Sequence, residues 1–376
     1  MGLGIAFRSK DFMRGAKSSH FIHGLDAIRF FCALWVYMGH YGAPPLPASV
    51  DKTTIFGVLA TGVYNNLTPG PAAVIVFFVI SGLCIHAQSP SVFGSWLDII
   101  VFLTRRYLRI IPPMLIAIAI AEYATKVKLD LFEQTILWSL LAEMIYYTLY
   151  PLLLWIRSAV GDWRSIIITA FAVSLMVAAT NPTAGNYPSY GVSMNWLLGL
   201  PCWLLGCELA DRLKGPTNRR PEWNIWIWRG GILLLACACS VLRFHSPIGY
   251  PWTLNFFALA AQAWLYREIV HFKSGGPRGV FDWAGKWSYS LYLVHPLAVS
   301  FYRQAPIDIS ASLPAWLAQT GFVLIFSYGF AVLFEFTSHR FARYVAGVMK
   351  GNAYLASISA FKWPSAVLTI GKSRAD

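Results

Sequence analysis

Long apolar runs, separated by short polar turns, make up most of this chain. Each run is close to the roughly 20 residues that cross the hydrocarbon core of a bilayer as a helix. We predict ten spans, at residues 25–42, 72–90, 108–126, 134–156, 165–181, 194–211, 225–243, 252–267, 286–303 and 314–336. The pattern therefore favours an all-α fold, a polytopic membrane helix bundle of about ten transmembrane helices.

The connections between these spans are short. The largest internal loops, near residues 43–71, 91–107 and 268–285, have too few residues to bury a core of their own. We therefore expect one transmembrane domain over residues 25–336, between an N-terminal tail of residues 1–24 and a C-terminal tail of residues 337–376.

The placement of charge adds an orientation to this picture. Only 12% of the 376 residues are charged, against about 25% in ordinary globular chains. A net charge of +13 would suit nucleic acid if the basic residues shared one soluble face. Most of them fall instead in alternate connections and in the tails, as the positive-inside rule requires for an even number of spans. We expect both termini on the cytoplasmic side of a bacterial inner membrane, with lipid and not nucleic acid as a partner.

The cysteines do not change the class of protein. All six fall within predicted spans, and none has the spacing to histidine or to another cysteine that zinc sites use. They are Cys32, Cys84, Cys202, Cys207, Cys237 and Cys239. We expect buried thiols, no tightly bound cofactor and no metal site.

Three ionisable residues interrupt the first predicted span. A charged side chain at membrane depth costs about 2.5 to 3.5 kcal/mol, so each needs a partner or a function. Asp26 and Arg29 are three residues apart and can pair on one helical face. Arg29 and His40 are eleven residues apart, which places them within about 20° of one face and roughly 16 Å apart along the helix. We expect this helix to present a cation and an imidazole to one cavity, with simple packing of satisfied polar groups as the alternative.

A cluster of basic residues precedes the third predicted span. Arg105, Arg106 and Arg109 lie within little more than one helical turn, at the expected cytoplasmic boundary. Guanidinium groups held there suit phosphates, which they bind through paired, charge-assisted hydrogen bonds. An anchor to anionic lipid is the alternative that any basic juxtamembrane cluster offers.

Polar residues also interrupt other spans. Glu143 lies within the fourth and needs a partner such as Arg29 or His40, unless it stays protonated. Ser81 stands beside a glycine in the second span, where close helix packing is the preferred explanation and substrate contact is the alternative.

The ninth span carries a histidine next to a proline. Pro296 has no amide proton, so the helix is locally open there and can bond the ring of His295. Tyr292 lies one turn earlier. We assign both side chains a possible substrate contact, with a structural polar contact as the alternative.

Five stretches, taken in order, resemble the signature segments of the acyltransferase family 3 membrane proteins. They are Gly24-Leu25-Asp26-Ala27-Ile28-Arg29 followed after ten residues by His40; Phe77-Phe78-Val79-Ile80-Ser81-Gly82; Arg105-Arg106-Tyr107-Leu108-Arg109; Trp138-Ser139-Leu140-Leu141-Ala142-Glu143; and Ser288-Tyr289-Ser290-Leu291-Tyr292-Leu293-Val294-His295-Pro296. Together they extend over most of the chain.

The resemblance implies an enzyme that uses acyl-CoA. We expect an O-acyltransferase that moves an acyl group, acetyl by default, from cytoplasmic acyl-CoA to a sugar hydroxyl of an exported or cell-surface glycan. His40 would act as general base, with Arg29, Asp26 and Glu143 around it, and the three arginines of the basic cluster would bind the phosphates of the donor. The alternative is a transporter or flippase of a sugar or glycan, which would also need intramembrane charges and a polar cavity.

Overall fold

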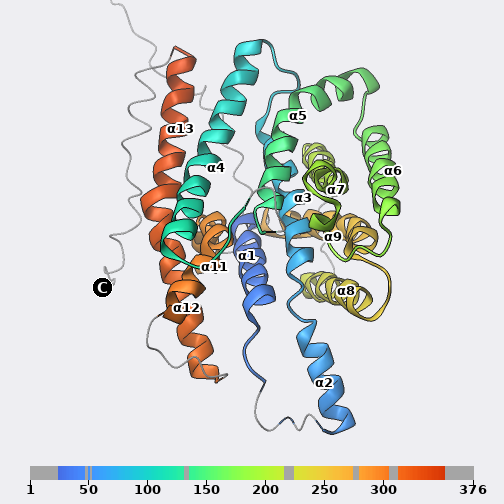
Figure 1. Ribbon diagram of the computed structural model, residues 1–376. Helices are drawn as coiled ribbons and strands as arrows, with labels where there is room; N and C mark the ends of the chain where they lie inside the picture. Colours follow the sequence, from blue (N-terminus) through green and yellow to red (C-terminus); the bar gives the residue numbers. More distant parts are fainter. Residues whose placement is uncertain are drawn as a thin grey trace, which may run out of the picture.

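The computed structural model describes residues 24–46, 50, 53–130, 135–215, 224–273, 279–304 and 312–351, and every regular element within these ranges is helical (Figure 1). The basic residues of the predicted N-terminal tail, and the C-terminal tail beyond residue 351, lie outside them. The helices are α1 (Leu25–Tyr41), α2 (Ile55–Asn65), α3 (Gly70–Gln88), α4 (Trp96–Ala124), α5 (Trp138–Val160), α6 (Arg164–Thr180), a short 3-10 helix (Tyr187–Tyr190), α7 (Val192–Arg212), α8 (Ile225–His245), α9 (Tyr250–Lys273), α10 (Val280–Gly285), α11 (Ser288–Gln304), α12 (Leu313–Phe330), a π-helical turn (Ala331–Glu335) and α13 (Phe336–Met349).

A helix lies over each of the ten predicted spans, but six helical segments of the described chain are long and apolar enough to cross a membrane. They are Ile55–Gln88, Trp96–Ala124, Trp138–Val160, Val192–Arg212, Ile225–His245 and Leu313–Met349. The count of ten is therefore not confirmed. Three of the remaining helices, α1, α6 and α11, have 17 residues each, and α9 carries polar and charged side chains along its length.

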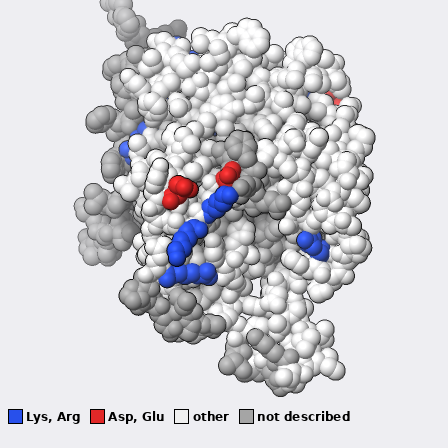
Figure 2. Space-filling view, in the orientation of Figure 1, with Lys and Arg blue, Asp and Glu red and all other residues white. Residues whose placement is uncertain are grey.

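These six segments indicate a membrane protein. Figure 2 shows one face on which most side chains are neither acidic nor basic, as a lipid-facing surface requires. The charged side chains visible on this face gather mainly near its centre.

Three helices lie where the sequence pattern predicted loops or tail. α4 begins at Trp96, capped by the hydroxyl of Ser95, which accepts from the amide of Asp98 at 3.2 Å. The predicted loop at 91–107 is therefore largely helix, and the arginines of the basic cluster lie inside α4. α2 begins after the side-chain cap Thr54, within the predicted loop at 43–71. α13 continues past residue 336, where the last predicted span ends.

α3 is the buried centre of the bundle and packs most closely on α7. A Cβ atom added at Gly82 would meet the carbonyl oxygen of Trp203, and one added at Gly206 would meet the carbonyl oxygen of Val79. Two glycines thus allow the backbones of the two helices to touch, the packing expected of Ser81-Gly82.

Helix α13 is fastened to α4 at a proline. Pro112 has no amide proton to donate to the carbonyl of Leu108, four residues earlier. The hydroxyl of Ser338 on α13 donates to that carbonyl instead. The proline therefore opens a site on α4 at which a second helix is bound.

An ionic group ties α3, α5 and α7 together at the end of the bundle where α1 begins. Asp211 accepts from Arg157 at 2.7 Å, from Lys214 at 2.7 Å and from the indole of Trp163 at 3.1 Å. Its other neighbour is His86, 2% exposed, whose Nε2 lies 2.9 Å away. Each charge here has counter-charge or hydrogen-bond donors, which marks the group as structural.

Candidate active site

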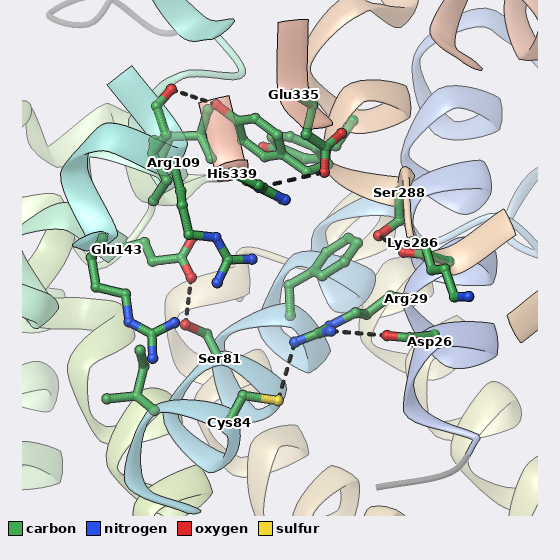
Figure 3. A pocket seen from close by; sticks show the side chains of 18 of the residues that line it. Asp26, Arg29, Ser81, Cys84, Arg109, Glu143, Lys286, Ser288, Glu335 and His339 are labelled. Carbon is green, nitrogen blue, oxygen red and sulfur yellow. Dashed lines mark hydrogen bonds and ion pairs between the residues drawn. The ribbon is translucent and has the colours of Figure 1, made fainter. Parts of the chain in front are cut away.

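A cavity of about 590 Å³ opens between α1, α3, α4, α5, α11 and α13 (Figure 3). Its charged lining residues are Asp26, Arg29, Arg106, Arg109, Glu143, Lys286, Glu335 and Arg343. This lining holds more basic than acidic side chains. A cavity of this size is within the range that binds small molecules and cofactors.

Arg29 forms one wall of the cavity near the start of α1. Its Nη1 donates to Asp26 at 3.1 Å, so the predicted Asp26–Arg29 contact is present. Its Nη2 donates to the sulfur of Cys84 on α3, also at 3.1 Å. In Figure 3 the guanidinium lies between these two partners and faces the open space. Cys84 is the one cysteine of the six in the lining.

The opposite wall carries three further arginines. Arg106 and Arg109 on α4 are joined there by Arg343 of α13. None of the three forms a salt bridge with a carboxylate within the described ranges, and the buried Nε of Arg106 has no hydrogen-bond partner there. Arg105 is exposed on α4 and is not part of the lining. The basic cluster that faces the cavity therefore contains Arg343 in place of the predicted Arg105.

Glu143 reaches the cavity from α5 but has partners other than those expected. The hydroxyls of Ser81 and Tyr147 both donate to its Oε1. Among the described contacts it has none with Arg29 or His40, the two partners suggested from the sequence. Ser81 in turn accepts from the indole of Trp203 at 3.2 Å. Hydroxyl groups of α3 and α5 thus satisfy this carboxyl group and leave the nearby arginines free for a ligand.

A second carboxyl group in the lining was not recognised from the sequence. Glu335 ends the π-helical turn and is 2% exposed. The amide and the hydroxyl of Ser290 donate to it at 3.2 and 2.5 Å, and His339 lies 3.9 Å away. A carboxyl group within an apolar span is the signal that identified Glu143, and Glu335 also lies within a predicted span, at residues 314–336.

The two histidines singled out in the sequence meet at the other end of α1. The Nδ1 of His40 lies 3.0 Å from the Nε2 of His295, and the two rings are nearly parallel, with centroids 5.2 Å apart. His295 is fully buried, whereas His40 is exposed. His40 is not part of the cavity lining. Arg29 and His40 therefore face two different places, and the single cavity expected from their spacing is not observed.

The hydrogen bonds of the histidine pair fix which nitrogen carries each proton. Pro296 leaves the carbonyl of Tyr292 without its helical donor, and the Nδ1 of His295 lies 2.8 Å from that oxygen. A carbonyl only accepts, so this Nδ1 is protonated, and the Nε2 of a neutral ring must accept from the Nδ1 of His40. The Nε2 of His40 then holds a free lone pair, for which the described residues offer no donor. A ring held in this way is suited to accept a proton.

Tyr292 stands between the cavity and the histidine pair. Its side chain lines the cavity, where its hydroxyl is 2.6 Å from that of Ser139 and donates to the carbonyl of Ile136 at 2.9 Å. Its own carbonyl accepts from His295. One residue is thus shared by the two regions.

The family of the chain follows from comparison with known proteins. A family model described as an acyltransferase domain matches residues 22–336. The chain belongs to the acyltransferase 3 family. The matched range includes His40, His295 and all of the charged cavity lining except Arg343. The chain is therefore an acyltransferase, and the catalysed step is acyl transfer.

One curated relative supports the same class. Acyltransferase MdmB of Streptomyces mycarofaciens is 24% identical over 331 residues, which cover 74% of this chain and 79% of that protein. No solved structure matches the acyltransferase.

Proposed function

We propose that this acyltransferase moves an acyl group, acetyl by default, from cytoplasmic acyl-CoA to a sugar hydroxyl of an exported or cell-surface glycan. The observation that carries the proposal is the division of α1 into two ends. Arg29 opens onto a basic cavity, and His40, eleven residues later and about 16 Å along the helix, offers a free imidazole nitrogen. Such a pair of sites suits a donor bound at one side of a membrane and an acceptor bound at the other.

The basic cavity supports acyl-CoA as the donor. Arginines without carboxylate partners are costly in a partly buried site unless an anion binds there. CoA supplies phosphates for such arginines, and its flexible pantetheine arm can carry the thioester past Tyr292 toward His40. In this arrangement the Arg29 end faces the cytoplasm and both termini lie on the same side.

The histidine pair supports general-base catalysis at His40. Its Nε2 takes the proton of the acceptor hydroxyl while the hydroxyl oxygen attacks the thioester carbonyl, forming a C–O bond. The tetrahedral adduct then breaks its C–S bond, and His40 returns the proton to the departing thiolate. Atoms and charge balance without a covalent intermediate on the protein.

Aromatic side chains around His40 support a sugar as the acceptor. The ring of Tyr41 lies edge-on to His40 with centroids 6.4 Å apart, and Arg303 lies 5.6 Å from the centroid of Tyr41. Rings with polar edges can pack on a sugar face while a cation or hydroxyl bonds its substituents.

Thiol release from acetyl-CoA by the purified protein tests the proposal. Wild type with a glycan acceptor should release free CoA and form an acyl ester, His40→Ala should lose nearly all of this activity, and His245→Ala, at an exposed histidine at the end of α8, should keep it. Equal release by wild type and His40→Ala would contradict the proposed base. Passage of unmodified sugar across vesicles without thiol release would favour the transporter.

A further inference from the structure

Helix α13 lies along α4 in the opposite direction (Figure 1). Residues of both helices line the cavity. Ser338 is bonded to the carbonyl of Leu108, and Lys350 pairs with Asp98 at 3.5 Å. From Ser338 to Lys350 the chain advances by twelve residues, while their partners on α4 go back by ten residues, from Leu108 to Asp98. By interpolation, Arg343 of α13 lies level with about residue 104 of α4.

Three residues of α13 line the cavity, Phe336, His339 and Arg343. His339 and Arg343 are four residues apart, which places them on one face about 6 Å apart along the axis. His339 is half-buried beside Glu335, whereas Arg343 is exposed and lies at the mouth. Both residues lie beyond the range that the family model matches.

The basic groups of the cavity are therefore spread along its length. By the same interpolation, Arg343 lies roughly 3 Å nearer the mouth than Arg106 and roughly 7 Å nearer than Arg109, on the side away from His40. Glu143 and Glu335, the nearest carboxyl groups, are bonded to hydroxyl groups and a backbone amide. Positive charge spread along a cavity in this way suits a ligand that carries more than one anionic group.

We propose that Arg343, with His339 beneath it, binds the 3′-phosphate of the CoA ribose, while Arg106 and Arg109 bind the diphosphate. The assignment rests on the proposed donor. The thioester has to extend toward His40, so the nucleotide end stays at the mouth, where Arg343 lies. α13 is then the element that distinguishes CoA from a donor without the 3′-phosphate.

Protection of Cys84 from a maleimide measures donor binding without turnover. Cys84 lies in the cavity beside Arg29, and the mass of its labelled peptide reports its occupancy. Detergent-purified wild type, Arg343→Gln and Arg343→Lys would be titrated with CoA and with 3′-dephospho-CoA. Arg164→Gln, at an exposed arginine at the start of α6, is the matched control for loss of one charge, and thermal unfolding confirms that each variant is folded.

We expect wild type and Arg164→Gln to bind CoA at least tenfold more tightly than 3′-dephospho-CoA. Arg343→Gln should weaken CoA binding by about tenfold or more and leave 3′-dephospho-CoA binding unchanged, with Arg343→Lys in between, since lysine keeps the charge but not the guanidinium fork. Equal weakening of both ligands, or no change in either, overturns the assignment of Arg343 and leaves the proposed donor standing. Absence of protection by CoA in wild type overturns the proposed donor itself.

Discussion

The surroundings of the two ends of α1 differ in charge. At the Arg29 end, basic side chains outnumber acidic ones and several lack a carboxylate partner within the described chain. At the His40 end, two neutral rings satisfy each other and a carbonyl, and one nitrogen is left over. The first end is therefore suited to bind an anion, and the second end is suited to accept a proton. Donor binding and proton transfer are thus assigned to places that can be altered separately.

The ionic group around Asp211 shows how paired charges differ from the arginines of the cavity at the same end of the bundle. Its carboxylate has four partners, one on α3, one on α5 and one in each of the turns after α5 and α7, and its arginine is paired. Arg106, Arg109 and Arg343 of the cavity lie at the same end, and none of them has a salt bridge to a carboxylate within the described ranges. A protein that needed these arginines only for stability could have paired them in the same way.

The largest expected effect is at His40. His40→Ala should lower the rate of acyl transfer by about 10² to 10⁴-fold, because it removes the general base. Protection of Cys84 by CoA should not change, since His40 does not line the cavity. Loss of CoA binding in this variant would contradict the separation of the two ends.

For the arginines of α4 we expect weaker CoA binding with little change in the maximal rate. Arg106→Gln combined with Arg109→Gln should weaken CoA binding by about 10 to 100-fold, because charge-assisted hydrogen bonds contribute about 1.5 to 3 kcal/mol each and their effects do not simply add. At saturating donor the transfer rate should recover to near the wild-type value. Titration of the rate against acyl-CoA measures this. A rate that stays low at saturation would show that these arginines act in the chemical step.

A smaller effect is expected at the partner of His40. His295→Phe removes the acceptor for the Nδ1 of His40 and so frees its tautomer and orientation. The maximal rate should fall by about tenfold while the KM for acyl-CoA stays constant. His295→Gln, which keeps a polar group that can accept, should recover part of the rate. If both variants behave like His40→Ala, His295 takes part in the reaction more directly.

The smallest effect is expected at the boundary between the two regions. Tyr292→Phe removes one hydroxyl and its bonds to Ser139 and the carbonyl of Ile136. We expect a loss of about 1 kcal/mol in stability, measured as a lower midpoint of thermal unfolding, and a transfer rate within tenfold of wild type. A much larger loss of rate with unchanged CoA binding would mean that the hydroxyl guides the thioester toward His40.

The local features of the site could be predicted from the sequence. The contact between Asp26 and Arg29 follows from a spacing of three, and the bond from His295 to the Tyr292 carbonyl follows from the proline beside it. Both depend on one helix alone. Helices were likewise found at all ten predicted places, because an apolar run long enough to fold as a helix is a local property.

What the sequence could not supply were contacts between distant segments. Arg343 joins the cavity only because α13 binds the Leu108 carbonyl, across 230 residues of chain. Glu143 finds hydroxyl groups on α3 and α5, where charge complementarity alone favoured Arg29 or His40. The predicted count of ten spans was not confirmed for a related reason, since short helices such as α1 pack against other helices and need not match the thickness of a bilayer.

The π-helical turn at Ala331–Glu335 sets how the faces of α12 and α13 are aligned about the helix axis. A π-helical turn holds one residue more than an α-helical turn, and such turns are frequent at functional sites. The turn absorbs this extra residue, so later side chains keep the faces that a continuous α-helix one residue shorter would give them. A one-residue deletion between Phe336 and His339 is not absorbed in this way and would turn every later side chain by about 100° about the axis. His339 and Arg343 would then leave the cavity although neither had been replaced. Insertions and deletions between the turn and His339 are therefore expected to be as damaging to donor recognition as substitutions of the arginines.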